Sequence, residues 1–299
     1  MRAVAAIVPM LFAGACATTG QQAQHAPTNT QNAPSGAQQA RNEPQATQTP
    51  ARHARRSRQA AQDPALQPGE PPFDRAARAA VAHQDNLTQM AFWAQEYEMH
   101  PQDLETAQKF VDALRLGGRA ERGSAVALEA LEKHPNDQVL MRSYGLSLLV
   151  SGKPQDALRP LAMAASSDPK DWSIRSALGA ALDQLSRPEQ ARQAYQEALA
   201  LKADDPGVLT NLGVSYLMTG DAGQAEGILQ KAAALPGATS ETRVNLAVAV
   251  ALQGRFDEAE RLQRVDLPPE MVAANMAYLR TLQSNPRRWG ELNSARRRR

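Results

Sequence analysis

A period of 34 residues runs through the middle of this sequence. Residues of one type recur at that step in four columns: Gly145, Gly179 and Gly213; Ala157, Ala191, Ala225 and Ala259; Leu178, Leu212 and Leu246; and Pro101, Pro135 and Pro169. A fifth column holds glycine at four positions, with Ser186 in its one gap: Gly118, Gly152, Gly220 and Gly254. Columns that share one period indicate an array of helical repeats rather than a single globular core.

Within one period, the apolar residues predict two helices joined by a turn. Ile174, Leu178, Leu182 and Leu185 fall at helical spacing on one face of the first helix. Gly179 lies on that helix, where the missing side chain permits close approach of a partner helix. The second helix is expected to begin near Pro188, because proline suits a first helical turn. Its inner face is predicted to hold small-large-small residues, Ala191, Tyr195 and Ala198.

These units resemble tetratricopeptide repeats. That family places Leu-Gly in the first helix, an apolar or aromatic residue three positions later, then a small-large-small set and a closing proline. One unit here spells Tyr144-Gly145, Leu148, Ala157, Leu161, Ala164 and Pro169. The resemblance implies an all-α solenoid of about five units over residues 104–266, which Gln263 and Asp266 close by breaking the pattern. Residues 73–103 are expected to form a degenerate N-terminal repeat or cap, and residues 267–285 a C-terminal capping helix.

The N-terminus resembles a bacterial lipoprotein signal over residues 1–15. An apolar run at residues 3–12 and three small residues precede Cys16, the one cysteine of the chain. The resemblance implies that Cys16 is acylated after cleavage, whereas the alternative is an ordinary secretory signal with an unrelated cysteine. The run is too short to span a bilayer as a helix. Because Ala17 is not the aspartate that resembles an inner-membrane retention signal, we expect a lipid anchor in the outer membrane, facing the periplasm.

Residues 16–72 are expected to be a disordered tether. After Cys16 they are dominated by small and polar residues, and Leu66 is their single large apolar side chain. Such a segment cannot bury enough surface to offset the loss of chain entropy. The arginines between residues 52 and 58, and those of the basic tail at residues 286–299, are interpreted as solvated charges. Contact with anionic lipid or with a docking partner is the alternative for each cluster.

Composition and motifs argue against catalysis and against nucleic-acid binding. Aromatic residues make up 4% of the chain and the formal net charge is +2, so neither favours a nucleic-acid partner. The sequence contains no Gly-rich phosphate loop, no nucleophile elbow and no His, Asp or Glu set at metal-ligand spacing. We therefore expect no enzyme activity, no cofactor and no metal site.

A stacked helical array offers a groove lined by the first helix of each unit, and we expect a protein segment to bind there. In this family the second, fifth, ninth and twelfth positions of a unit tend to face the groove, and a sixth-position asparagine can bond a peptide backbone. The predicted groove residues are Arg142, Leu146, Leu149, Asn211, Val214, Leu217, Asn245 and Val248. Two alternatives remain open: the C-terminal helix at residues 271–283 occupies the groove, or the leucines and valines are core between repeats.

A short stretch near the C-terminus, residues 275–280, resembles the closing helix of TadD-type proteins. These are tetratricopeptide-repeat lipoproteins of the tight-adherence (Flp) pilus assembly system. The resemblance implies an adaptor that helps to assemble or localise the pilus secretion apparatus, with a pilus component such as the outer-membrane secretin as its partner. The alternative is an envelope scaffold lipoprotein for cell-wall enzymes.

Overall fold

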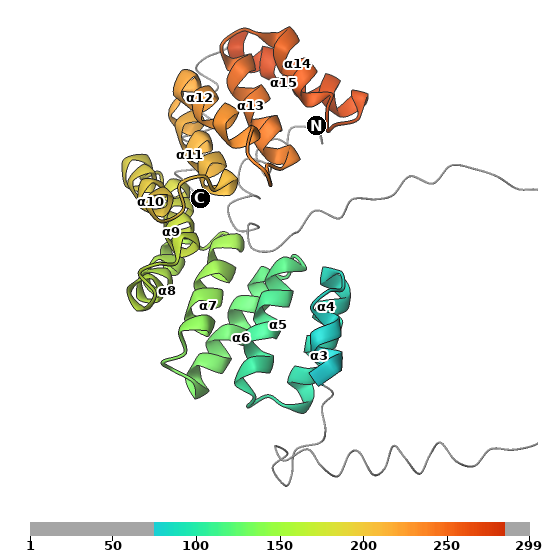
Figure 1. Ribbon diagram of the computed structural model, residues 1–299, viewed down its shortest axis with the longest axis vertical. Helices are drawn as coiled ribbons and strands as arrows, with labels where there is room; N and C mark the ends of the chain where they lie inside the picture. The colour runs from blue at the N-terminus through green and yellow to red at the C-terminus, as the bar shows by residue number, and fades with distance from the viewer. Residues whose placement is uncertain (1–74, 285–299) are drawn as a thin grey trace, which may run out of the picture. The chain divides into compact units, whose positions relative to one another are not determined.

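The computed structural model describes residues 75–284, and every regular element in that range is an α-helix (Figure 1). The helices are α3 (Arg75–Val81), α4 (Asn86–Met99), α5 (Leu104–Leu116), α6 (Ala120–Lys133), α7 (Gln138–Val150), α8 (Pro154–Ser167), α9 (Trp172–Gln184), α10 (Pro188–Leu201), α11 (Pro206–Thr219), α12 (Ala222–Ala233), α13 (Ser240–Leu252), α14 (Phe256–Gln263) and α15 (Pro269–Ser284). The predicted all-α repeat solenoid is thereby confirmed. The predicted signal, Cys16, the tether and the basic tail lie outside the described residues.

Helix α3 belongs to a separate compact unit, and the repeat array comprises α4–α15. Five helix pairs form the repeats: α5 with α6, α7 with α8, α9 with α10, α11 with α12, and α13 with α14. We call the leading member of each pair its first helix and the other its second helix. Each first helix also packs against the first helix of the next repeat, and α4 and α15 pack at the two ends of the series (Figure 1).

The start of each first helix is set by a side chain that caps it. Each capping oxygen accepts a hydrogen bond from a backbone N–H of the first turn, and the caps recur every 34 residues, at Asp103, Asp137, Asp171, Asp205 and Thr239. Such caps stabilise a helix by about 1 kcal/mol each. Four of the five second helices instead follow a basic residue that makes no capping bond, Arg119, Lys153, Arg187 or Arg255. Side-chain caps thus fix the start of all five first helices and of one second helix, α12, which Asp221 caps.

The glycine column of the first helices brings the two helices of a pair into direct contact. A Cβ at Gly145 would lie 2.7 Å from Leu161 Cγ on the second helix, and one at Gly213 would lie 2.6 Å from Leu229 Cγ. Real Cβ atoms do not approach carbon so closely, so these positions accept glycine alone without a shift of the partner helix. The other glycine column lies in the turns between paired helices. Its members adopt φ values of 76° to 86°, and Ser186, which fills the gap in that column, has φ 58°.

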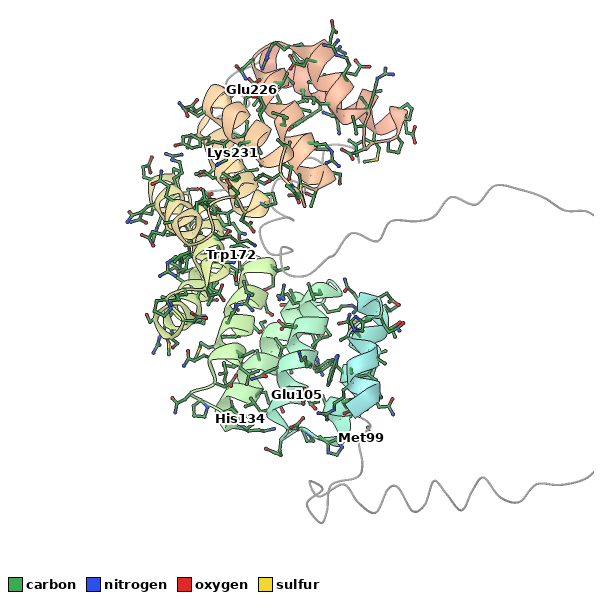
Figure 2. The ribbon with its side chains drawn as sticks, viewed as in Figure 1. Met99, Glu105, His134, Trp172, Glu226 and Lys231 are labelled. Atoms are coloured by element: carbon green, nitrogen blue, oxygen red, sulfur yellow. The ribbon has the colours of Figure 1, made fainter. Side chains whose placement is uncertain are left out.

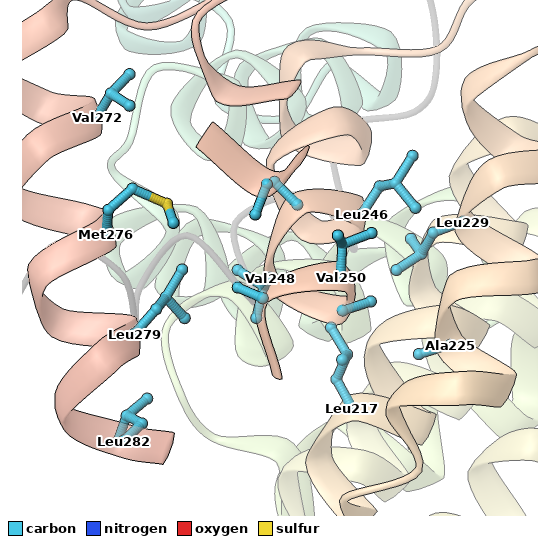
Figure 3. Close-up of a cluster of buried hydrophobic side chains, with 14 residues drawn as sticks. Leu217, Ala225, Leu229, Leu246, Val248, Val250, Val272, Met276, Leu279 and Leu282 are labelled. Atoms are coloured by element: carbon cyan, nitrogen blue, oxygen red, sulfur yellow. The ribbon is translucent and has the colours of Figure 1, made fainter. Parts of the chain in front are cut away.

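The end of the array is sealed by an apolar cluster that joins α11–α15 (Figure 3). Helix α15 contributes four side chains exposed by 3% or less, Val272, Met276, Leu279 and Leu282. Both residues that break the repeat pattern have partners at this end. Asn275 Nδ2 donates to Gln263 Oε1 at 3.0 Å, and Arg243 forms a two-pronged ion pair with Asp266 at 2.6 and 2.7 Å.

Candidate protein-binding surface

Exposed aliphatic side chains gather on the first helices near the start of the array. Val139, Arg142, Leu146 and Val150 follow one another at steps of three or four residues along α7, so they share one face of that helix. Val139 is 47% exposed and Val150 is 44% exposed, whereas Leu146 between them is 7% exposed. Leu116 precedes Val150 by one period, at the corresponding end of α5, and is 38% exposed. We call Leu116, Val139, Arg142 and Val150 the first-helix surface.

Most of the predicted groove residues are buried. The exposed fraction is 9% or less for seven of the eight, Leu146, Leu149, Asn211, Val214, Leu217, Asn245 and Val248. Leu146 and Leu149 belong to one apolar cluster with α8 and α9, while Leu217 and Val248 belong to the cluster that includes α15. These side chains pack between repeats and leave a partner little surface in this state. Their role in binding stays a prediction.

The eighth residue, Arg142, is partly exposed and joins the second repeat to the third. Its Nε lies 3.3 Å from Asp171 Oδ2, and its Nη2 donates to Ser173 Oγ at 2.9 Å. Asp171 is also the cap of α9, where its carboxylate accepts from the Ser173 and Ile174 backbone N–H groups. The Asp171 carboxylate thus pairs with Arg142 and also caps the first turn of α9. Because Asp171 balances its charge, Arg142 presents no strong positive potential to a partner.

Polar side chains also connect the first helices of the third and fourth repeats. Asn211 Nδ2 donates to Ser176 Oγ at 3.2 Å. Further along the same two helices, Ser215 Oγ donates to Asp183 Oδ1 at 2.9 Å. Tyr195, from the second helix α10, donates to the other oxygen of Asp183 at 3.1 Å. Buried polar links of this kind fix the register of neighbouring helices because each group loses its partner if the helices slide.

The equivalent link is absent at the next repeat boundary. Asn245 stands one period after Asn211 and is 1% exposed, yet its Nδ2 has no hydrogen-bond partner among residues 75–284. The residue one period after Ser176 is Thr210, and its hydroxyl is already engaged. It donates to Pro206 O at 2.7 Å and lies 2.9 Å from Thr242 Oγ1. Asn245 is therefore a buried donor with no acceptor in the part of the chain that the structure describes.

Ion pairs near the C-terminal end lower the pKa values of carboxyl groups, and two of these groups connect different elements. Hydrogen bonds from Arg243 lower the pKa of Asp266 despite its partial burial. A hydrogen bond from Arg255 lowers the pKa of Glu226, which lies on α12 (Figure 2) and also accepts from Gln253 at 2.7 Å. Both carboxylates hold loops or turns against neighbouring helices. Their lowered pKa values are therefore attributed to ion pairs that stabilise the fold rather than to a catalytic site.

The described residues contain neither a cluster of metal ligands nor a helix that could span a membrane. Between residues 75 and 284, no group of three or more His, Cys, Asp or Glu side chains is placed to hold a metal ion. In the same range, none of the helices combines the length and apolar character that crossing a bilayer requires.

Sequence reasoning did not single out the most exposed apolar residues of the first helices. Val139 occupies the second position of its unit, which was expected to face the groove, so the repeat frame already contained its signal. Leu116 and Val150 occupy the thirteenth position, which lies four residues after the ninth and therefore on the same helical face. Extending the frame by one more position would have found them.

Comparisons with known proteins agree with this architecture. Tetratricopeptide-repeat profiles match residues 143–206 and 176–239, and a further tetratricopeptide-repeat profile matches residues 240–262. A comparison with curated proteins finds no match.

Among solved structures, TTC0263, a thermophilic tetratricopeptide-repeat protein of Thermus thermophilus, is 19% identical, with a TM-score of 0.49, over 66% of this chain and 100% of that chain. MamA from Desulfovibrio magneticus RS-1 is 20% identical, with a TM-score of 0.46, over 53% of this chain and 89% of that chain. A second MamA structure, from MSR-1, is 23% identical, with a TM-score of 0.44, over 53% of this chain and 91% of that chain.

Proposed function

We propose that this tetratricopeptide-repeat protein is a protein-binding adaptor and that the first-helix surface contacts its partner. The observation that carries the proposal is the exposure of Val139 and Val150, each close to one half, at the two ends of one face of α7. Leu116 extends this apolar surface onto α5. Removing such side chains from water favours association by about 25 cal/mol per Å² of apolar area.

The chemistry of the surface defines the kind of segment that fits it. Three of its four members are aliphatic, and Arg142 is balanced by Asp171. The apolar face of a helix, or alternate side chains of an extended segment, matches such a lining. An acidic peptide does not, because no unbalanced cation of this surface would hold its charge.

A second contact is proposed at Asn245, whose buried amide becomes accessible to a partner only when the repeats around α13 separate. A buried donor without an acceptor costs about 1–3 kcal/mol, and a backbone carbonyl of a bound segment would recover that free energy. Residues that lower the free energy of unfolding without a compensating contact frequently lie at functional sites.

The proposal extends to the attachment of the protein. Cys16, in its lipoprotein-like context, would carry the acyl chains that hold the protein to the periplasmic side of the outer membrane. Residues 17–72 would separate that anchor from the repeats by a root-mean-square span of roughly 40–45 Å. The partner would then be a protein within reach of the membrane surface.

The same proposal gives the adaptor a place in tight-adherence (Flp) pilus assembly. Its support is the likeness of residues 275–280 to the closing helix of TadD-type proteins. In this role the adaptor assembles or localises the secretion apparatus, and a component such as the outer-membrane secretin is the bound protein.

Site-specific photo-crosslinking in producing cells tests the proposal. A crosslinking amino acid at Val150 is expected to capture a discrete protein partner, which mass spectrometry then identifies. Leu128 is the matched control, because it is 51% exposed but lies on the second helix α6. Equal capture from both positions, or none from Val150, contradicts the adaptor surface. A captured protein from outside the pilus apparatus keeps the adaptor role and rejects the pilus assignment.

The membrane anchor is tested separately. The Cys16→Ser variant is expected to leave the membrane fraction, and retention of the variant in that fraction rejects acylation as the anchor.

A further inference from the structure

One column of the repeat places an exposed or partly exposed side chain at the end of every first helix. The column is the thirteenth position of the unit, and its members are Leu116, Val150, Gln184, Met218 and Leu252. Each is the last or next-to-last residue of its helix, and four of the five are large and apolar. Leu116 and Val150 are 38% and 44% exposed, and the other three are partly exposed. We call these five residues the thirteenth-position row.

The row crosses the first helices instead of following one of them. Each first helix packs against the first helix of the next repeat, so equivalent positions of successive repeats are neighbours. Packed helices lie about 8–10 Å apart, and this distance sets the interval between neighbouring members of the row. A segment that contacts several members must therefore present side chains on one face at that interval.

The interval distinguishes the two kinds of segment that fit the first-helix surface. In a helix, seven residues span about 10.5 Å and return to the same face after almost two turns. In a strand, two residues span about 6.6 Å and four span about 13 Å, while three residues place the side chain on the opposite face. A polyproline II segment repeats every 9.3 Å or so, about the right interval, but the grooves that bind it are lined by aromatic residues. None of the members of the row is aromatic, so a helix matches it best.

Exposed basic residues flank the row. Three positions after its members, where the second helices begin, four of the five repeats carry a cation and one carries Asp221: Arg119, Lys153, Arg187 and Arg255. Lys153 and Arg255 pair with carboxylates, whereas Arg119 and Arg187 are exposed and form no ion pair among residues 75–284. Helices α6 and α10, which these two arginines precede, have no side-chain cap, so the partial positive charge of each helix start adds to that of the guanidinium. Both arginines lie outside the first-helix surface, whose own cation is balanced.

We propose that the partner segment is an amphipathic helix that lies across the first helices along the thirteenth-position row. It carries an apolar residue at every seventh position and acidic residues on the side that faces Arg119 and Arg187. This inference rests on the proposed function, because it specifies the segment that the adaptor binds. It extends the contact beyond the first-helix surface to Met218 and Leu252 in the last two repeats.

Mapping the partner residues that photo-crosslinking captures tests the helix. The crosslinking amino acid is placed in turn at Leu116, Val150 and Met218 in producing cells, and mass spectrometry locates the attached residue of the partner. Capture points from Leu116 and Val150 are expected about 7 residues apart in the partner, and those from Val150 and Met218, which are two repeats apart, about 14. An extended or polyproline II segment gives about 3 and about 6 residues instead.

The outcomes separate this inference from the function on which it rests. Spacings near those of an extended segment overturn the helix and leave the adaptor role intact. Absence of capture at all three positions overturns both. Capture of a second copy of this chain assigns the row to self-association and overturns the helix of a partner.

The flanking charges are tested by the double variant Arg119→Glu with Arg187→Glu. Association with the captured partner is expected to slow by about tenfold at low salt, and the difference from the wild type is expected to shrink as salt is added. The matched control is Arg159→Glu with Arg261→Glu, which makes the same change of charge at exposed positions of α8 and α14. The control is expected to associate at the wild-type rate. Equal rates for all three proteins overturn the acidic side of the helix.

Discussion

A Cβ placed on Gly179 would lie 2.6 Å from Cε1 of Tyr195, so the second helix of the third repeat rests directly on the backbone of the first. Tyr195 is 2% exposed and donates its hydroxyl hydrogen to Asp183, which also accepts from Ser215 of the next repeat. The absence of one side chain at Gly179 therefore positions a tyrosine that links two helices of its own repeat to a third helix beyond. This close packing explains why glycine recurs every 34 residues in the sequence.

Gly179→Ala is expected to destabilise the array by up to about 2 kcal/mol. Overpacking costs about 1–3 kcal/mol, and the better helix propensity of alanine returns about 1 kcal/mol. Gly227→Ala is the matched control, because Gly227 lies inside α12 with open space around its Cβ position. That variant is expected to gain about 1 kcal/mol. Urea denaturation followed by circular dichroism measures both, and a stabilised Gly179→Ala would contradict the close contact.

Ser186→Gly is expected to stabilise the protein by about 1 kcal/mol, since a left-handed backbone is unfavourable for residues with a Cβ. Ser186 holds φ 58° in the turn between α9 and α10. The reciprocal change, Gly152→Ser, places serine at φ 76° in the turn between α7 and α8, and it is expected to lose a similar amount. Thermal unfolding of the two variants compares the turns, and a change of the same sign in both would contradict this explanation.

Asp266→Asn is expected to lower stability at neutral pH by about 1–2 kcal/mol, because it removes charged hydrogen bonds to the partly exposed Arg243. The pKa of Asp266 is lowered in the folded state by those bonds. Its contribution is therefore present above the unfolded value of about 3.9 and is lost as the pH falls through the lower folded value. Denaturation from pH 7 to pH 2 should show the two proteins converging in acid. Asp257→Asn, at an exposed position of α14, is the control. A gap that persists in acid would assign the effect to packing.

Asn245→Leu is expected to leave stability unchanged or to raise it by about 1 kcal/mol, because the variant removes a buried donor that lacks an acceptor in the described part of the chain. Asn211→Leu is expected to cost about 1–2 kcal/mol, since it leaves the Ser176 hydroxyl without its donor. If Asn245 contacts the partner, its leucine variant also binds more weakly. Chemical denaturation together with partner titration separates these outcomes, and a strong loss of stability in Asn245→Leu would show an unrecognised structural bond.

The repeat boundaries could be predicted from the sequence, because the residue type that each packing position requires recurs every 34 residues. The Gly179 contact lies within one unit, so its glycine shows directly in a column, whereas the aspartate caps recur at the same period but were not singled out. The frame also identified Gln263 and Asp266 as departures, and the structure gives these two residues their partners at α15 and α13.

The solvent-exposed fraction of each side chain within a repeat could not be predicted in the same way. Leu146 and Val150 share one helical face, yet their exposed fractions are 7% and 44%. The difference depends on how much of each side chain the neighbouring repeats cover, and no single unit carries that information. The pairing of Arg142 with Asp171 was missed for a related reason. The two residues lie in successive repeats, and either alone reads as an ordinary surface charge.

Partner affinity of the double variant Val139→Glu with Val150→Glu tests the central claim most directly. Two carboxylates on the first-helix surface would have to be desolvated on binding, so the affinity is expected to fall by at least about tenfold, or about 1.4 kcal/mol. Leu128→Glu, at an equally exposed aliphatic position on α6, is expected to bind as the wild type does. Titration of the crosslink-identified partner against the three proteins decides the matter. Weakened binding in the double variant alone supports the account, and unchanged binding in a helical double variant would contradict it.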